Sequence, residues 1–419
     1  MSLRKAFERA VEQRDYVVDI LRRIIAVDNS IPPGSNYHQL LDVVEPEFRR
    51  FGLSTERVLV PQDRVNQIPE SLHGERANLV ASLTNGKPKV SVYAHMDTVP
   101  VDNPWSRDPF GGEVANGRIY GRGAEDMKGA IACLLGALKV MHEMDLEPSF
   151  EIDCLLCTDE EVGIYPGARY LAEEGYFSNH LLWLELGAMA PISTLGTAGS
   201  ARIDITGVGR SCHSGMNYLG INAIEEMLPV MQELVGLKAE VQSRESATPS
   251  FPLPAIPSEK MTPMFSITVM RGGGKDNTVP GECTITVNRR YIIEEAYADV
   301  VEEIEQAIER GRARSDLLDV RIEATNAFYP VSINPGNPAA KRMRAAVSDV
   351  LGYTEFLYGG LAVSTDLGFV IEALKPLKAE VACCGLARPG SSTAHAVDES
   401  VLVNDLVAMT KLLLHYFCA

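Results

Sequence analysis

The feature that most constrains this chain is a short apolar stretch that ends in an imidazole and a carboxylate. Residues 89–100 read KVSVYAHMDTVP, in which apolar residues alternate up to His95 and Asp97, before the turn-forming Pro100. This alternation predicts a β-strand, and side chains two residues apart on a strand share a face. In an open α/β sheet the carboxyl ends of the strands border the ligand crevice. This stretch alone leaves two interpretations open: a metal-binding His95 oriented by Asp97, or an ordinary surface pair.

Length and charge limit the classes of protein to consider. A chain of 419 residues is too long for one ordinary core, so we expect two domains. A hydrophobic content of 46% and a charged content of 23% are typical of a soluble globular protein. The net charge of −17 leaves no basic stripe and argues against a nucleic-acid partner. Bound divalent cations could neutralise part of this negative charge.

The sequence predicts a cytoplasmic protein with no membrane partner. It has no apolar run of transmembrane length, and residues 1–27 read as an amphipathic helix rather than a signal peptide. The eight cysteines are scattered, as in a reducing compartment. Cys154 and Cys157 form a CxxC pattern, but three residues apart on a strand they lie on opposite faces, which disfavours a shared metal or a redox pair.

The order of predicted elements indicates one domain inserted into another. Residues 197–328 read as strand, helix, two strands, helix and strand, which is the ferredoxin-like split motif. The flanking parts, 1–196 and 329–419, alternate helices with buried strands, so we expect a discontinuous α/β domain with a doubly wound mixed sheet. We also expect the proline-rich segment 246–263 to be an exposed loop.

Acids and imidazoles recur where predicted strands and helices end. They are His95, Asp97, Asp126, Glu160, Glu161, Glu185 and His395. Singly, Asp126 could be a helix N-cap, and the acids at 159–161 could be a solvated turn. The glycine-rich segment before Lys128 lacks the Walker spacing of a phosphate loop. Together, this donor set suits Zn²⁺, with Co²⁺ or Mn²⁺ as substitutes, and is large enough for two ions that share a bridging ligand.

Six motifs stand in an order that resembles a known family. They are HMDTVP, GRGAEDMKGA, TDEEVG, ELG, the triplet His213-Ser214-Gly215, and STAHAVDES. This order resembles the co-catalytic zinc hydrolases of family M20, which include acetylornithine deacetylase, succinyl-diaminopimelate desuccinylase, aminoacylase and glutamate carboxypeptidase. The resemblance covers essentially the whole chain. It implies that the inserted region is a lid that also forms a homodimer.

The resemblance also implies roles for the acids and imidazoles. His95 and Glu185 would bind one zinc, Glu161 and His395 the other, and Asp126 would bridge the two, with a cis peptide between Asp126 and Met127. Asp97 would orient His95. Glu160, beside a ligand but not itself one, would be the general base that takes a proton from a hydroxide-forming water held by both metals.

Three further residues would contact the substrate from the inserted region. By resemblance, His213 would stabilise the oxyanion, usually across a dimer interface, and Asn277 would bind substrate. Arg290 would grip a substrate carboxylate through its planar fork. Its neighbour Arg289 is the residue with which it could be confused, but Arg290 shares a strand face with Thr284, Thr286 and Asn288. In loop 359–369, Ser364, Thr365 and Asp366 correspond to the Gly-Thr/Ser-Asp core of many members.

The expected function is metal-dependent hydrolysis of the amide bond of a small N-acyl amino acid, as in a deacetylase or desuccinylase. A metallocarboxypeptidase or dipeptidase using the same site is the alternative, because Arg290 would serve either kind of substrate with a free carboxylate. A binding protein that keeps the fold without catalysis is a rival from another class, and the complete set of Glu160 and five ligands argues against it.

Overall fold

A six-stranded mixed sheet forms the centre of the larger part of the molecule. The computed structural model describes residues 3–187, 189–252 and 258–419. The strands lie in the order β1-β2-β6-β3-β7-β17. β6, β3, β7 and β17 run parallel, whereas β1 and β2 are antiparallel to their neighbours. Their bounds are β1 Ser54–Leu59, β2 Ala77–Leu83, β3 Lys89–His95, β6 Glu151–Cys157, β7 His180–Trp183 and β17 Glu380–Cys383.

The larger part also contains helices, of which α3, α5 and α10 contact the sheet directly. The helices are α1 Leu3–Glu12, α2 Arg14–Ile25, α3 Tyr37–Arg50, α4 Gln62–Val65, α5 Lys128–Glu143, α6 Gly167–Glu173, α10 Pro338–Leu351, α11 Leu367–Ala373 and α12 Val403–Cys418. α5 packs against α2 and α12, and every residue of α5 from Lys128 to Met141 is buried, as expected of a helix that is apolar nearly all round. None of the described helices combines the length and the apolar character needed to cross a membrane.

Short strands complete the larger part. β4 Glu113–Ala115, β5 Arg118–Tyr120 and β18 Ser400–Leu402 form one small sheet, and β8 Ile192–Thr197, β15 Val331–Ser332 and β16 Leu357–Leu361 form another. The second of these sheets lies where the chain leaves for the inserted region and returns from it. This part also contains two 3₁₀ turns, η1 Glu160–Val162 and η3 Lys375–Leu377, and a third, η2 Ser214–Leu219, lies in the inserted region.

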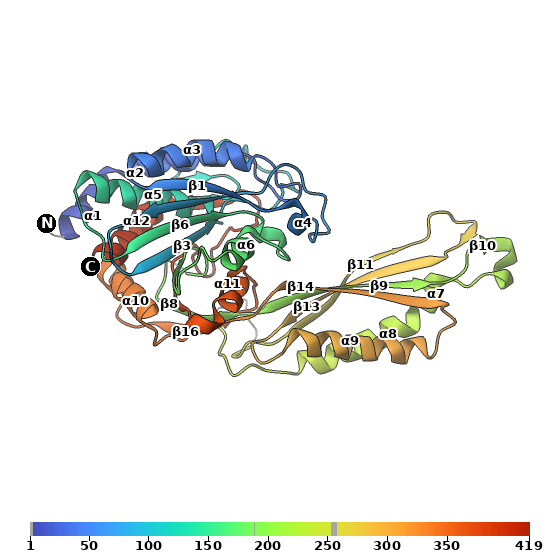
Figure 1. Ribbon diagram of the computed structural model, residues 1–419. Coiled ribbons are helices and arrows are strands. Elements are labelled where there is room, and N and C mark those ends of the chain that lie inside the picture. Colours follow the sequence, from blue (N-terminus) through green and yellow to red (C-terminus); the bar gives the residue numbers. More distant parts are fainter. Residues whose placement is uncertain (1–2, 188, 253–257) are drawn as a thin grey trace.

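The inserted region forms an elongated arm with its own core (Figure 1). Four antiparallel strands lie in the order β11-β13-β9-β14, and α8 and α9 pack on them. The bounds are β9 Gly199–Val208, β10 Cys212–His213, α7 Ala223–Glu226, α8 Leu228–Gln242, β11 Met264–Gly272, β12 Thr278–Val279, β13 Glu282–Tyr291, α9 Tyr297–Arg312 and β14 Asp319–Phe328. This order matches the predicted split motif, and the fold is the expected mixed α/β class.

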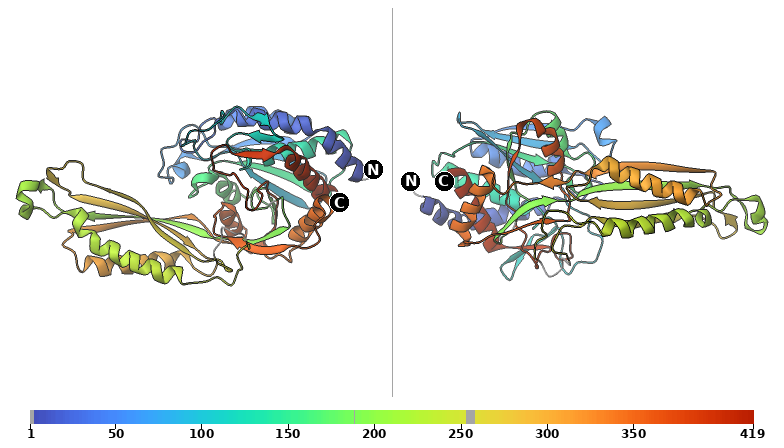
Figure 2. Two further views of the ribbon diagram at one scale, coloured as in Figure 1. Left: turned by 180° about the vertical axis from the view of Figure 1, so that it is seen from behind. Right: turned by 90° about the horizontal axis from the view of Figure 1, so that it is seen from below.

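The arm extends away from both chain termini, which lie close together at the opposite end of the molecule (Figure 2). Its outer tip carries β10, which pairs with β12 and contacts η2. The division of the chain at 196/197 and 328/329 into two domains stays a prediction.

One sequence-based expectation is wrong. The segment 246–263 is not simply an exposed loop, because Phe251 and Met261 are each only 2% exposed and Ser250 forms a β-bridge with Gly360. Its residues 253–257 lie outside the described residues. For the described residues of this segment, proline content predicted the irregular backbone correctly, but it says nothing of whether the apolar residues between the prolines are buried.

Candidate functional site

Three neighbouring parallel strands deliver the predicted residues to one edge of the six-stranded sheet. β6, β3 and β7 are adjacent, and His95 is the last residue of β3. Glu160 and Glu161 follow β6 in η1, and Glu185 follows β7. Because parallel strands end at the same edge, residues far apart in sequence meet there. Asp126 precedes α5, and His395 lies in the loop before β18.

The Asp126 carboxylate lies between two imidazoles. Its Oδ1 is 3.2 Å from His95 Nε2, and its Oδ2 is 3.3 Å from His395 Nε2. His395 Nε2 is also 3.1 Å from Glu161 Oε2. The peptide bond between Asp126 and Met127 is cis, as the resemblance implied. The helix N-cap interpretation of Asp126 is wrong, since α5 begins at Lys128 and Met127 occupies the cap.

Hydrogen bonds among these groups shift their pKa values. Hydrogen bonds to Asp126 and Glu161 raise the pKa of His395 to about 10. Burial opposes ionisation of Asp126, yet the hydrogen bonds from His395 and His95 lower its pKa below the ordinary value. A carboxylate with one oxygen on each imidazole is arranged as a bridging ligand would be.

Asp97 contacts both the His95 ring and the backbone of Glu161. The His95 Nδ1 lies 3.1 Å from the Asp97 backbone carbonyl oxygen and 3.8 Å from its carboxylate Oδ1. The Asp97 Oδ2 accepts a hydrogen bond of 2.9 Å from the Glu161 backbone N–H. The closer contact to the ring is therefore the carbonyl rather than the predicted carboxylate, which instead fixes the backbone of Glu161.

A second cluster of acids adjoins the first. Oxygens of Glu160, Glu185 and Asp366 lie within 4.8 Å of one another. Burial, followed by the charge of Glu185, raises the pKa of Glu160 well above its ordinary value. Burial also raises the pKa of Glu185 to about 7, although Thr365 and Trp183 donate hydrogen bonds of 2.8 and 3.1 Å to its Oε2.

The donor set fits divalent cations. Among the described residues, Glu160 Oε1 and both carboxylate oxygens of Asp366 are buried without a hydrogen-bond partner. Burying unpaired carboxylates so close together is costly unless positive charge compensates for it. Imidazole nitrogens beside carboxylate oxygens are ligands that zinc accepts.

Sequence reasoning gave no role to Asp366 or to Glu399. Asp366 is fully buried beside the acids, and its position in the Ser364-Thr365-Asp366 run was the available signal. Glu399, also fully buried, accepts hydrogen bonds from Arg122 Nη1 at 2.7 Å and from the backbone N–H groups of Gly123, Glu125 and Asp126 at 3.1, 3.0 and 3.1 Å. Glu399 thereby joins the loop of Asp126 to the segment that carries His395.

The two neighbouring arginines of β13 point to different surroundings. Arg289 is fully buried and its Nη2 lies 2.5 Å from Glu295 and 3.2 Å from Glu303, so its charge is already paired within the arm. Arg290 faces the other way and donates from Nη1 to Ser364 Oγ at 2.5 Å. The strand alternation therefore separates the two arginines as predicted, and Arg290 is the one beside the acids.

His213 and Asn277 lie together at the outer tip of the arm, away from the acids of the same chain (Figure 1). His213 is exposed, and the Ser214 backbone N–H donates to the Asn277 carbonyl oxygen at 3.0 Å. The structure thus brings His95, Asp126, Glu160, Glu161, Glu185 and His395 together with Arg290 nearby, and leaves His213 and Asn277 outside this group.

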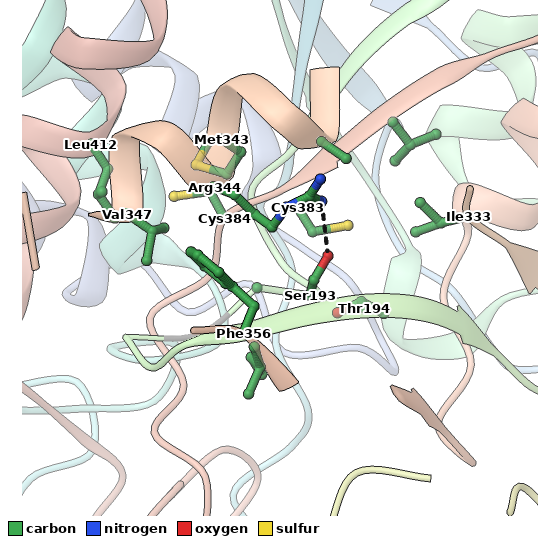
Figure 3. A pocket seen from close by; sticks show the side chains of 14 residues that line it. Ser193, Thr194, Ile333, Met343, Arg344, Val347, Phe356, Cys383, Cys384 and Leu412 are labelled. Carbon is green, nitrogen blue, oxygen red and sulfur yellow. Dashed lines mark hydrogen bonds between the residues drawn. The ribbon is translucent and has the colours of Figure 1, made fainter. Parts of the chain in front are cut away.

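A cavity of about 460 Å³ opens onto these acids. Asp126, Glu160, Glu161, Glu185 and His395 line one part of it. A much smaller cavity, of about 30 Å³, lies between α10, β8 and β17 (Figure 3). There Arg344 donates to Ser193 at 3.4 Å, and the volume holds about one water molecule. The cavity at the acids therefore has room for a small substrate, whereas the one beside Arg344 does not.

A mixed α/β sheet whose parallel strands carry acids and imidazoles to a cavity defines a class of hydrolase. The model of Peptidase family M20/M25/M40 matches residues 91–418, most of the chain. The chain therefore belongs to this family, and it is an enzyme that hydrolyses amide bonds.

Individual relatives differ in what they act on. The chain is 25% identical to N-formyl-4-amino-5-aminomethyl-2-methylpyrimidine deformylase of Bacillus subtilis (strain 168), over 99% of this chain and 96% of the relative. It is 28% identical to succinyl-diaminopimelate desuccinylase of Gluconobacter oxydans (strain 621H), over 81% and 83%. Its fold is similar to the M20 family metallo-carboxypeptidase Sso-CP2 of Sulfolobus solfataricus, with a TM-score of 0.76 at 17% identity over 96% and 97%.

Proposed function

We propose that this enzyme hydrolyses the amide bond of a small N-acyl amino acid, with Glu160 as the general base. The observation that carries the proposal is the Asp126 carboxylate shared by His95 and His395, next to a buried Glu160 that has an unpartnered oxygen. Family membership supports amide hydrolysis in general, and the named desuccinylase relative acts on an acylated amino compound.

Two divalent metals would fit this donor set. His95 and Glu185 would hold one, Glu161 and His395 the other, and Asp126 would touch both; zinc suits these ligands, with cobalt or manganese as substitutes. When bound, such a pair makes water more acidic and polarises a carbonyl oxygen.

Glu160 is suited to move the proton. Burial and the neighbouring Glu185 raise the pKa of Glu160 above its ordinary value, which makes its carboxylate a stronger base. Glu160 would take the proton of the attacking water and give it to the leaving amine nitrogen. Arg290, free of the ion pairs that occupy Arg289, would bind the substrate carboxylate through its guanidinium fork.

His213 and Asn277 would complete the site of a second copy of the chain. Both lie at the tip of the arm, and Met216, Tyr218 and Leu219 beside them are 45%, 77% and 53% exposed. An apolar patch of this kind at the end of an arm favours contact with another protein surface. The proposal is a homodimer in which residues 197–328 act as lid and dimerisation domain, and His213 stabilises the oxyanion in the partner's site.

The alternative is a metallocarboxypeptidase or dipeptidase that uses the same residues. It gains support from the solved metallo-carboxypeptidase with a similar fold. Arg290 would then bind the C-terminal carboxylate of a short peptide.

The proposed location is the cytoplasm. All eight cysteines are free, which supports this location.

The experiment is a hydrolysis screen with Glu160→Gln as the test variant. The enzyme, loaded with Zn²⁺, Co²⁺ or Mn²⁺, is incubated with N-acetyl and N-succinyl amino acids and with dipeptides. We expect Glu160→Gln to lower kcat by at least about 10²-fold while metal content, measured by elemental analysis, is unchanged. The exposed Glu355→Gln is the matched control. Unchanged hydrolysis in Glu160→Gln would overturn the general-base assignment, and hydrolysis that survives chelation would overturn the metal proposal.

A further inference from the structure

The part of the large cavity away from the acids is apolar. It is lined by Ile192, Phe251, Leu361, Val363, Leu386 and Pro389. Phe251 and Leu386 are 2% and 4% exposed, so they are fixed by packing rather than free to turn away. Val363, which is 48% exposed, forms the accessible rim of this wall. We refer to these six residues as the apolar wall.

The polar side chains beside the apolar wall already have partners. Arg388, whose side chain is 44% exposed, donates from Nε and Nη2 to the two carboxylate oxygens of Asp405, each at 2.6 Å, so this bidentate pair carries no net charge. Ser364 donates to the Ala198 carbonyl oxygen at 2.8 Å and accepts from Arg290. Among the described residues that line the cavity, Arg388 is the only lysine or arginine, and the sequence has no charged residue at 188 or 253–257.

Two kinds of substrate group would fit this arrangement differently. A succinyl group ends in a second carboxylate, which needs a cation or several donors when it leaves water. An aromatic or branched aliphatic group needs only apolar contact, and gains from the water that it displaces. The apolar wall supplies the contact that an aromatic or branched aliphatic group needs, and not the cation or donors that a second carboxylate needs.

The loop that carries Val363 places the wall directly beside the carboxylate-binding position. Val363 precedes Ser364, which contacts Arg290, and Leu361 ends β16 two residues earlier. A substrate whose carboxylate is held by Arg290 and whose amide lies over Glu160 would therefore have one of its side groups against the wall.

We infer that the enzyme prefers a substrate with a large uncharged apolar group, aromatic or branched aliphatic, on one side of the scissile amide, and that Phe251 and Val363 determine this preference. The inference rests on the proposed function and deepens it. It separates this chain from enzymes that act on succinylated amino acids.

The test is a matrix of substrates that all carry a free carboxylate. One series holds L-alanine constant and varies the acyl group through acetyl, succinyl, hexanoyl and benzoyl. The other holds acetyl constant and varies the amino acid through Gly, Leu, Phe, Asp and Lys. We expect kcat/KM for the best apolar member to exceed that of the matched small or charged member by at least about tenfold, the scale of discrimination by apolar pockets.

A pair of variants tests the wall itself. Val363→Arg places a cation on its rim, and Val114→Arg, at a position 49% exposed in β4, is the matched control. We expect the ratio of kcat/KM for benzoyl-alanine over succinyl-alanine to fall at least about tenfold in Val363→Arg and to stay unchanged in Val114→Arg.

Each outcome bears on one claim. A wild-type preference for succinyl, Asp or Lys substrates, or an unchanged ratio in Val363→Arg, overturns the inference while amide hydrolysis itself stands. No hydrolysis of any member by the metal-loaded enzyme overturns the proposed function, and this inference with it.

Discussion

Replacement of Glu399 by alanine is the perturbation whose cost the structure defines best. Glu399 is fully buried and accepts one hydrogen bond from Arg122 and three from the backbone of the Asp126 loop. The Arg122 side chain is itself only 4% exposed. Removing the carboxylate leaves a buried guanidinium without its anion, a change that costs about 3–5 kcal/mol. The three orphaned N–H groups add to this cost unless water enters.

We expect Glu399→Ala to lower the free energy of unfolding by about 3–5 kcal/mol. Glu399→Gln keeps an acceptor oxygen but not the charge, so its loss should be smaller. Urea unfolding followed by tryptophan fluorescence and circular dichroism is the assay, because both tryptophans, Trp105 and Trp183, lie outside the inserted region and Trp105 packs on Arg122. Chelator is present throughout, so that metal binding does not contribute.

Metal affinity is a second readout, which distinguishes a loss of stability from a change at the metal-binding residues. Because Glu399 fixes the backbone of Asp126, we expect Glu399→Gln to weaken metal binding about 10–100-fold, as residues behind metal ligands usually do. The exposed Glu355→Ala is the control and should change stability by less than about 0.5 kcal/mol. If Glu399→Ala unfolds within about 1 kcal/mol of the wild type and binds metal equally well, the reasoning about this buried pair is wrong.

Three other predictions test separate parts of the account. In mixtures of His213→Ala with Glu160→Gln, random pairing leaves one complete site in half of the dimers, so activity should recover to about a quarter of wild type; recovery no greater than the sum of the two variants would contradict a shared site. Arg290→Lys should raise KM for a carboxylate substrate at least about tenfold, since lysine cannot donate in a bidentate fork, and an unchanged KM in steady-state assays would count against that role. Burial lowers the pKa of His180 from 6.5 to about 4, so the unfolded chain binds a proton that the folded chain does not, and stability should fall as pH drops from 6.5 to 4; thermal melts of His180→Gln should show a smaller fall, and an equal fall would refute the assignment.

Much of the site could be predicted from sequence because its side chains lie at the ends of strands that the apolar pattern indicates. The alternation in β3 ends at His95, and apolar runs precede Glu160 and Glu185, so the parallel sheet was enough to bring them together. The same alternation separated Arg290 from Arg289 on β13, where Arg290 contacts Ser364 and Arg289 contacts the acids of the arm.

The parts that sequence reasoning missed depend on long-range packing. Glu399 accepts a hydrogen bond from the backbone N–H of Gly123, which lies 276 residues earlier in the chain. No local sequence pattern predicts a contact between residues so far apart. Asp366 stands in a motif already singled out, but only its burial beside Glu160 and Glu185 shows that its carboxylate belongs with the acids. Phe251 was assigned to an exposed loop because prolines surround it, and its packing against the cavity follows from the tertiary fold.

We propose that Asp126 joins two metal positions, one beside His95 and one beside His395. Anomalous diffraction from crystals of the zinc-loaded enzyme, recorded on both sides of the zinc absorption edge, tests it most directly. We expect two peaks about 3.5–4 Å apart, the first in contact with His95 and Glu185, the second with Glu161 and His395, and Asp126 in contact with both. A single peak at saturating zinc, or peaks away from Asp126, would contradict it.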